Sequence, residues 1–209
     1  MKNYLVEFIG TMFLVLVIGL TIIDGAGALA PLAIGSMLMV MVYAGGHISG
    51  GHYNPAVTLA VWLRGKCPTK DVAPYMAAQV LGGIVAALLV SFCKPGAQVS
   101  ASSPDVARAL LVELLFTFAL CYVVLNTATS KKNAGNSYYG LAIGFTVLAG
   151  AFAGGAISGG AYNPAVAVGI SVMGLSALPN LWVFLVGNFA GGALAAVVYK
   201  IANPEEYKK

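Results

Sequence analysis

The sequence predicts an all-α integral membrane protein with six transmembrane helices and two re-entrant half-helices, and three observations lead to that fold class. First, 59% of the 209 residues are apolar and 9% are charged, whereas a soluble domain carries about 25% charged residues. Second, six apolar runs are long enough to cross a bilayer, which takes about 20 helical residues. Third, a glycine-rich segment that ends in Asn-Pro-Ala-Val occurs twice. A soluble enzyme, a disordered chain and a nucleic-acid binder all fit this composition poorly.

The transmembrane helices follow from the apolar runs in chain order. We expect spans over 5–23, 31–49, 72–93, 107–128, 138–156 and 179–200. Two shorter apolar stretches, 54–63 and 163–173, follow Asn-Pro and are too short to cross the bilayer, so half-helices are expected there. The spans leave room only for short loops, and residues 1–209 are therefore expected to form a single domain.

Lys and Arg are distributed unequally between the two sides that six spans create. Nine basic residues fall on the side of the termini and two, Lys94 and Arg108, fall on the other side. Because cytoplasmic loops carry an excess of Lys and Arg, we expect both termini in the cytoplasm and the protein in the plasma (inner) membrane. The net charge of +4 then reflects orientation rather than a nucleic-acid partner. The nine residues are Lys2, Arg64, Lys66, Lys70, Lys131, Lys132, Lys200, Lys208 and Lys209.

The glycine-rich segment belongs to an internal repeat. Residues 45–57 read GGHISGGHYNPAV and residues 154–166 read GGAISGGAYNPAV, so the copies differ only where two histidines become alanines. Each half of the chain, about 1–95 and 105–209, holds three spans, and an odd number makes the second half enter the membrane from the opposite side. The halves are therefore expected to be inverted repeats, related by a pseudo-two-fold axis in the membrane plane.

The two repeated loops are expected to enter the membrane and meet near its middle. Glycine disfavours helix by about 1 kcal/mol per residue, and non-helical backbone at membrane depth is tolerated only inside protein or along a wet cavity. Pro55 and Pro164 suit the first position of a helix, and Asn54 and Asn163 suit its cap. Two positive helix ends and two amides then converge, which favours neutral hydrogen-bonding solutes, opposes cations and interrupts a proton-conducting chain of waters.

At these residues the chain resembles the major intrinsic protein family, the aquaporins and aquaglyceroporins. The two motifs that carry the resemblance are Asn54-Pro55-Ala56 and Asn163-Pro164-Ala165. The resemblance implies a right-handed bundle of six tilted helices plus two half-helices, with one pore per subunit in a homotetramer. It also implies water and small neutral solutes as the molecules that pass, within a lipid bilayer and with no cofactor. Cys67, Cys93 and Cys121 match no metal-binding spacing, so no metal is expected.

Small residues offer only a weak argument for association. The glycine pairs at 82–83 and 191–192, and the spacing of Gly140 and Gly144, permit close approach of helices. Such contacts could lie within the bundle or between subunits, so the homotetramer is expected from the resemblance alone.

Two acids and two histidines are candidates for further roles in the bundle. Glu7 and Glu113 are predicted within spans, where an acid is a functional candidate. They could couple transport to protons, or they could accept hydrogen bonds from the backbone of the re-entrant loops. Their repeat-related positions and the resemblance favour the second role. His47 is interpreted as a buried donor that supports the first loop, and either His47 or His52 could supply a pH gate.

Val166 departs from the pattern of the family. Most members have arginine directly after the second motif, where it belongs to the outer constriction of the pore. Arginine is a fixed charge with five hydrogen-bond donors, and valine offers neither. Alignment with the family assigns Ile34, Ala151 and Gly160 to the same ring, and some plant vacuolar-membrane aquaporins also carry valine at this position. We therefore expect a wide, mostly apolar constriction.

The resulting hypothesis is a passive channel for water and small neutral solutes, with glycerol, urea, ammonia or peroxide able to enter. A water-selective channel is the first alternative, although no residue of the ring would narrow it. A coupled secondary transporter, which also uses inverted repeats and broken helices, is the second, and a non-conducting scaffold is the third. An enzyme is not expected, because the sequence lacks a plausible nucleophile set, a metal spacing or a phosphate-binding glycine motif.

Overall fold

The computed structural model describes residues 1–23 and 25–207, and its regular elements are helical. Six of the described helices are long and apolar enough to cross a membrane, which confirms the predicted number of spans. The α-helices are α1 (Lys2–Ile22), α2 (Ala30–Ser49), α3 (Pro55–Leu63), α4 (Thr69–Cys93), α5 (Val106–Val124), α6 (Tyr139–Ser158), α7 (Pro164–Val172) and α8 (Leu181–Ala202). The short helices α3 and α7 are the two predicted half-helices.

The ends of the helices follow local chemistry. Helices α2 and α6 both stop at a glycine in the left-handed region, Gly50 with φ of 94° and Gly159 with φ of 98°, a conformation that glycine adopts without steric cost. Helices α3 and α7 both begin at proline. Helix α5 continues through a π-helical turn, Leu125–Thr129, so the predicted span over 107–128 is one helix whose last turn is widened.

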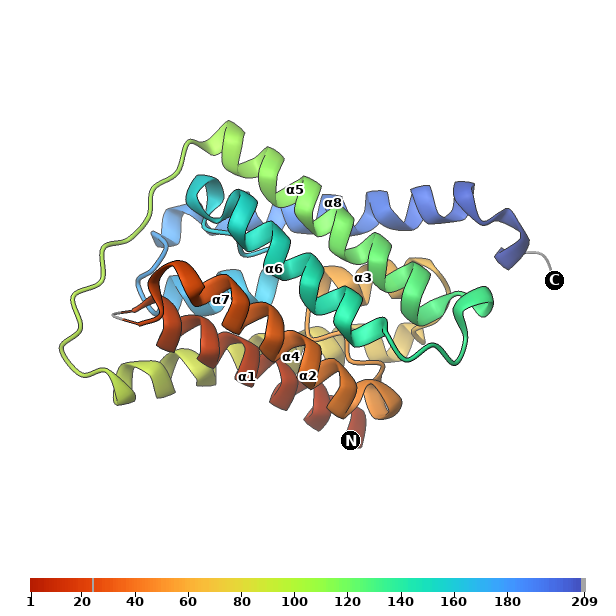
Figure 1. Ribbon diagram of the computed structural model, residues 1–209, viewed down its shortest axis with the longest axis horizontal. Helices are drawn as coiled ribbons and strands as arrows, with labels where there is room; N and C mark the ends of the chain where they lie inside the picture. The colour runs from red at the N-terminus through yellow and green to blue at the C-terminus, as the bar shows by residue number, and fades with distance from the viewer. Residues whose placement is uncertain (24, 208–209) are drawn as a thin grey trace.

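Helices of the two halves pack in matching pairs. Helix α1 packs on α4, α5 packs on α8, and α2 meets α6 between the halves. The half-helices cross over, because α3 packs against α8 and α7 packs against α4. Each half-helix is therefore held by the last span of the other half. In Figure 1 both termini lie toward one end of the bundle, and the long connection between α4 and α5 crosses the opposite end.

Glycines make the crossed packing possible. A Cβ atom added at Gly83 would lie 2.6 Å from the carbonyl oxygen of Ala165, and one at Gly192 would lie 2.7 Å from that of Ala56. Both glycines therefore let a transmembrane helix touch the first turn of a half-helix. A Cβ at Gly144 would lie 2.5 Å from the Gly35 carbonyl oxygen. These small residues are used inside the chain, so they give no support to contacts between subunits.

Large apolar side chains cover the outside of the long helices. Such a surface suits a bilayer, because a water-soluble monomer rarely exposes large contiguous apolar patches. Side chains that are at least half exposed include those of Leu5, Leu81, Leu88, Phe92, Leu111, Trp182, Val197 and Ile201. The chain is an integral membrane protein, as the sequence predicts.

Candidate functional site

The two half-helices are capped in the same way. The Oδ1 atom of Asn54 accepts hydrogen bonds from the backbone N–H groups of Ala56, at 2.8 Å, and Val57, at 3.4 Å. Asn163 caps α7 through the two equivalent N–H groups, at 2.9 and 3.4 Å. Side-chain capping satisfies donors that a helix start leaves free. It also fixes each amide plane, because the oxygen is held at a known position.

The amide nitrogen of each asparagine reaches across to the other loop. Asn54 Nδ2 donates to the carbonyl oxygen of Tyr162 at 2.9 Å, and Asn163 Nδ2 donates to that of Tyr53 at 2.8 Å. A side-chain amide has two N–H donors, so the cross-link uses one, and the other has no partner among the described residues. Inverted symmetry predicts that the asparagines meet, but the motif spacing gives no signal for this exchange.

Glu7 holds the first re-entrant loop. Its carboxylate accepts hydrogen bonds from the backbone N–H groups of His52, at 3.0 Å, and Tyr53, at 2.6 Å. It also accepts from Ser49 Oγ at 2.6 Å and from Gln79 Nε2 at 2.8 Å. These four donors surround a side chain that is fully buried. A carboxylate is well suited to this position because it offers acceptors only.

Glu113 repeats this arrangement in the second half. It accepts from the N–H groups of Ala161 and Tyr162, from Ser158 Oγ and from Asn188 Nδ2, at 2.7 to 2.9 Å. Neither Glu7 nor Glu113 is among the residues that line the cavities described below. The geometry therefore places both acids behind the loops and away from the path of a solute.

His47 and His52 have different surroundings, and His47 does not have the buried position that the sequence predicts. His47 is exposed in the last turn of α2 and has no hydrogen-bond partner among the described residues. The interpretation of His47 as a buried donor that supports the loop was wrong, because α2 continues to Ser49 and the loop starts only after it. His52 is the buried histidine, with Nδ1 3.1 Å from Thr58 Oγ1.

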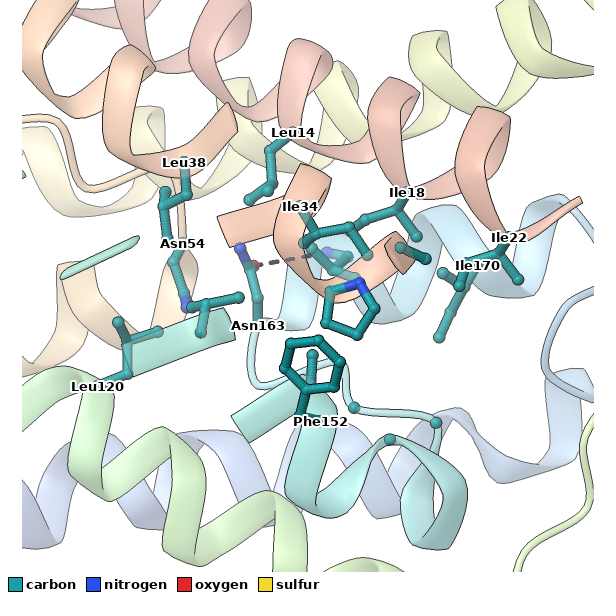
Figure 2. Close-up of a pocket in the computed structure, with 18 of the residues that line it drawn as sticks. Leu14, Ile18, Ile22, Ile34, Leu38, Asn54, Leu120, Phe152, Asn163 and Ile170 are labelled. Carbon is teal, nitrogen blue, oxygen red and sulfur yellow. Dashed lines mark hydrogen bonds between the residues drawn. The ribbon is translucent and has the colours of Figure 1, made fainter. Parts of the chain in front are cut away.

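An apolar cavity of about 350 Å³ reaches the connection between α1 and α2, where Ile22, Gly27 and Pro31 line it. Its lining includes all four residues assigned to the outer constriction, namely Ile34, Ala151, Gly160 and Val166, together with Asn54 and Asn163. Figure 2 shows both asparagines reaching a space surrounded by aliphatic side chains and the ring of Phe152. None of the four constriction side chains carries a charge or a hydrogen-bond donor.

A second cavity of about 300 Å³ lies between the end of α2, the segment that joins α3 to α4, and the π-helical turn after α5. Its lining includes Lys66, Cys67 and Tyr75 and is more polar than that of the first. His52 and Val124 line both cavities, so the two spaces come together at this pair. The sequence interpretation does not name Val124, because one valine among many in a transmembrane helix carries no distinguishing signal.

No cluster of three or more His, Cys, Asp or Glu side chains suited to a metal ion occurs in the described part of the chain. The three cysteines are free thiols, and Cys67 and Cys121 are buried. The polar side chains that line the first cavity include the amides of Asn54 and Asn163 and the imidazole of His52, groups suited to neutral solutes that form hydrogen bonds.

Comparison with known proteins gives consistent findings. The family described as major intrinsic protein matches residues 1–199. An aquaporin of Zea mays is 40% identical over 177 residues, which cover 82% of this chain and 69% of that protein. A glycerol uptake facilitator protein-like protein of Lactiplantibacillus plantarum is 35% identical over 217 residues, covering 99% of this chain and 100% of that protein.

Among solved structures, the aquaglyceroporin from Plasmodium falciparum superimposes with a TM-score of 0.82 over 98% of both chains. Its sequence identity to this chain is 21%, so the match establishes a shared fold.

Proposed function

We propose that this chain, which belongs to the major intrinsic protein family, is a passive channel for water and small neutral solutes. Its outer constriction is proposed to be wide and apolar. The observation that carries this proposal is the cavity of about 350 Å³, which joins the two asparagines to Ile34, Ala151, Gly160 and Val166. Water, glycerol, urea, ammonia and peroxide are the solutes expected to enter.

The absence of a charged side chain in the ring supports a broad range of solutes. Val166 is buried, with 3% of its surface exposed, at the position where most family members carry arginine. Valine neither repels cations nor offers donors to orient water, and it takes up less room than the long guanidinium side chain. Selection at the outer mouth therefore rests on the apolar wall and the backbone.

Exclusion of cations and protons is assigned to the middle of the pore. The first turns of α3 and α7 point their positive ends at the two asparagines. Each amide keeps one N–H for a passing water. The oxygen of the water accepts a hydrogen bond from this N–H, and the water molecule is thereby oriented. Without an arginine in the outer ring, this central site carries most of the barrier to charge.

Coupled transport is the less supported alternative. It needs an ionisable group in contact with the solute, yet Glu7 and Glu113 are absent from the cavity linings and their oxygens already accept bonds from the loops. A water-selective channel would need a narrow polar ring, and the four residues of this ring supply no polar side chain. We propose that the protein has no enzymatic activity.

The proposal extends to assembly and location. A homotetramer with one pore in each subunit, in the plasma (inner) membrane and with cytoplasmic termini, agrees with the family and with the excess of Lys and Arg on one side. Lys208 and Lys209, two of those residues, lie outside the described part of the chain. The chain is proposed to act as one domain built of two inverted repeats.

Radiolabelled urea or glycerol uptake into proteoliposomes tests passive conduction. The solute should reach the same concentration inside and outside, and an imposed pH or sodium gradient should change neither the rate nor the end point. Accumulation above the outside concentration under either gradient would establish a coupled transporter instead. A folded tetramer that conducts no solute and no water would support the scaffold alternative.

A further inference from the structure

The residue before each Asn-Pro-Ala motif has an unusual backbone conformation. Tyr53 and Tyr162 both have φ of 49°, and they are the two non-glycine residues with positive φ in the described chain. Residues with a Cβ atom rarely adopt this left-handed region, and bulky ones do so only where their surroundings enforce it. Because both repeats keep tyrosine here, the feature that enforces the conformation is expected to involve the side chain.

The tyrosine hydroxyl groups supply that enforcement. Tyr53 Oη donates to the carbonyl oxygen of Met41 at 2.9 Å, and Tyr162 Oη donates to that of Gly150 at 2.8 Å. The acceptor precedes the tyrosine by 12 residues in each repeat. Each ring thus spans from its own loop back to the preceding transmembrane helix, α2 or α6.

Glycines make room for these rings. A Cβ atom at Gly10 or Gly45 would overlap the ring or hydroxyl of Tyr53, and one at Gly154 would overlap the hydroxyl of Tyr162. Gly45 and Gly154 are equivalent positions in the two repeats. Both rings are almost completely buried, at 0% and 1% exposed. The slot and the hydroxyl acceptor together leave each side chain one position.

The backbone of each tyrosine is fixed on both sides. Its N–H donates to Glu7 or Glu113, at 2.6 and 2.7 Å, and its carbonyl oxygen accepts from the asparagine of the opposite loop. The direction of that carbonyl is set by the backbone angles of the tyrosine. The hydroxyl contact therefore acts, through the carbonyl, on the amide that faces the pore.

We propose that Tyr53 and Tyr162 are positioning residues for the central proton barrier, because their hydroxyl contacts fix the carbonyls that aim Asn163 and Asn54. This inference rests on the proposed channel function. An amide whose cross-loop bond is loosened can turn its free N–H away from the passing water. The water chain would then be oriented less strictly, and protons would cross more often, while the width of the pore would stay the same.

The test is the ratio of proton flux to water flux in proteoliposomes that carry Tyr53→Phe, Tyr162→Phe or both. Phenylalanine keeps the ring in its slot and removes only the hydroxyl. In each single variant we expect the ratio to rise by roughly five-fold, about the factor by which one neutral hydrogen bond shifts an equilibrium, and in the double variant we expect a larger rise. Water flux itself should stay within about two-fold of the original protein.

Tyr43→Phe is the matched control. Tyr43 Oη also donates to a backbone carbonyl, that of Ser137, at 3.0 Å, but Tyr43 lines neither cavity and touches neither loop asparagine. Loss of the Tyr43 hydroxyl should leave the ratio of proton flux to water flux unchanged. If the double variant also leaves the ratio unchanged, or if Tyr43→Phe raises it equally, the positioning role is wrong. If the original protein carries no water, the proposed function fails, and the inference is judged by the following measurement.

A spectroscopic signature keeps the inference testable where flux is not informative. Because the cross-links are exchanged, Tyr53→Phe should shift or broaden the side-chain amide resonances of Asn163 more than those of Asn54. Tyr162→Phe should do the reverse. Equal effects of both variants on both amides would indicate general loosening and would overturn the proposal. If the double variant does not fold, the two single variants are used for both measurements.

Discussion

At the scale of single residues, the proposed outer constriction depends on the position after the second motif. Val166 is buried in the wall of the outer cavity and shares it with Ile34, Ala151 and Gly160. A charge at this position would face a space whose walls are mostly apolar. Arginine there would add bulk, a fixed charge and five donors at once, so this site is the natural place to convert a broad pore into a narrow one.

Val166→Arg should therefore reduce glycerol flux by about tenfold, the rate factor of a barrier raised by about 1.4 kcal/mol. Water flux should fall much less, because a water molecule needs less room and can accept hydrogen bonds from the guanidinium. Stopped-flow light scattering of proteoliposomes measures both fluxes. Val166→Met adds bulk without charge and separates the two effects. Equal losses of water and glycerol flux in Val166→Arg would show that Val166 does not control the constriction.

The buried acids are expected to matter for stability rather than for coupling. Glu7→Gln or Glu113→Gln would replace one acceptor oxygen with an amide nitrogen facing donors of the loop. An unsatisfied buried polar group costs about 1–3 kcal/mol, so the melting temperature of the detergent-solubilised protein should fall. Glu7→Asp or Glu113→Asp would keep both carboxylate oxygens but shorten the side chain by one methylene group, and would therefore test whether the length of the side chain matters. An unchanged melting temperature with altered pH dependence of solute uptake would contradict this account and favour a proton-coupling site.

The residue-scale features were predictable to different degrees. Glu7 and Glu113 could be named because acids are rare in spans and these two are related by the repeat. His47 was misplaced because the end of α2 at Ser49 depends on the left-handed turn at Gly50, and the two glycine pairs at 45–46 and 50–51 leave several positions open for that turn. The hydroxyl contacts of Tyr53 and Tyr162 could not be predicted, since they depend on the space that neighbouring glycines leave for the two rings.

At the scale of elements, the half-helices depend on close contact with spans of the other repeat. Gly83 and Gly192 let α4 and α8 lie directly against the carbonyls of Ala165 and Ala56. The hydropathy of the sequence indicates the two short stretches and their caps. It contains no information on which span packs on which half-helix, because every span presents apolar side chains.

Gly83→Ala and Gly192→Ala should each destabilise the fold. The added methyl group would meet a carbonyl oxygen at 2.6 or 2.7 Å, so a half-helix or a span must move. Overpacking of this kind costs typically about 1–3 kcal/mol, visible as a lower melting temperature. Gly155→Ala is the control for stability, because nothing lies within 4 Å of a Cβ there and alanine favours helix. A fall in melting temperature for Gly155→Ala alone would contradict this assignment.

The C-terminal segment Pro204–Tyr207 is a second element that the sequence does not reveal. Glu206 is buried and forms a salt bridge with Arg64 at 2.8 Å, next to the end of α3. Its other oxygen accepts from Ser130 Oγ at 3.0 Å and from the Lys131 N–H at 2.8 Å. In the sequence, a charged tail after the last span is more typical of a solvated terminus, so this docking was not predicted.

Docking of this segment should depend on pH in the acid range. Burial raises the pKa of the Glu206 carboxyl, but bonds from Ser130 and Lys131 and the charge of Arg64 bring the pKa below its ordinary value. The stabilisation is therefore present above the unfolded pKa of glutamate, about 4.3, and is lost as the pH falls through the lower folded pKa. The protection factor of the amides of residues 205–207, which is the intrinsic hydrogen-exchange rate divided by the observed rate at the same pH, should be high at neutral pH and lower at acid pH.

Glu206→Gln should lower this protection factor at neutral pH and should remove its further fall at acid pH. Lys132→Gln is a useful comparison, because it breaks the exposed pair of Lys132 and Glu205, which is expected to contribute little. Strong protection in Glu206→Gln at neutral pH would mean that the segment is held instead by the ring of Tyr207, which lies against Tyr199 and Arg64.

At the scale of the whole molecule, inverted symmetry organises both the fold and the pore. The spans could be predicted because lipid demands long apolar helices, and inversion follows from three spans in each repeat. The cavities could not be predicted in the same way. Their volumes, and their junction at His52 and Val124, depend on how the side chains of both halves pack together.

The most direct test of the central claim is the permeability of the unmodified protein to glycerol relative to water. Proteoliposomes are shrunk in an impermeant osmolyte to measure water flux, and their reswelling in a glycerol gradient measures glycerol entry. We expect the protein to accelerate both well above protein-free liposomes, because the four residues proposed for the outer ring carry no charge and no polar side chain. Fast water flux with glycerol entry equal to that of protein-free liposomes would contradict the broad pore and indicate a water-selective channel.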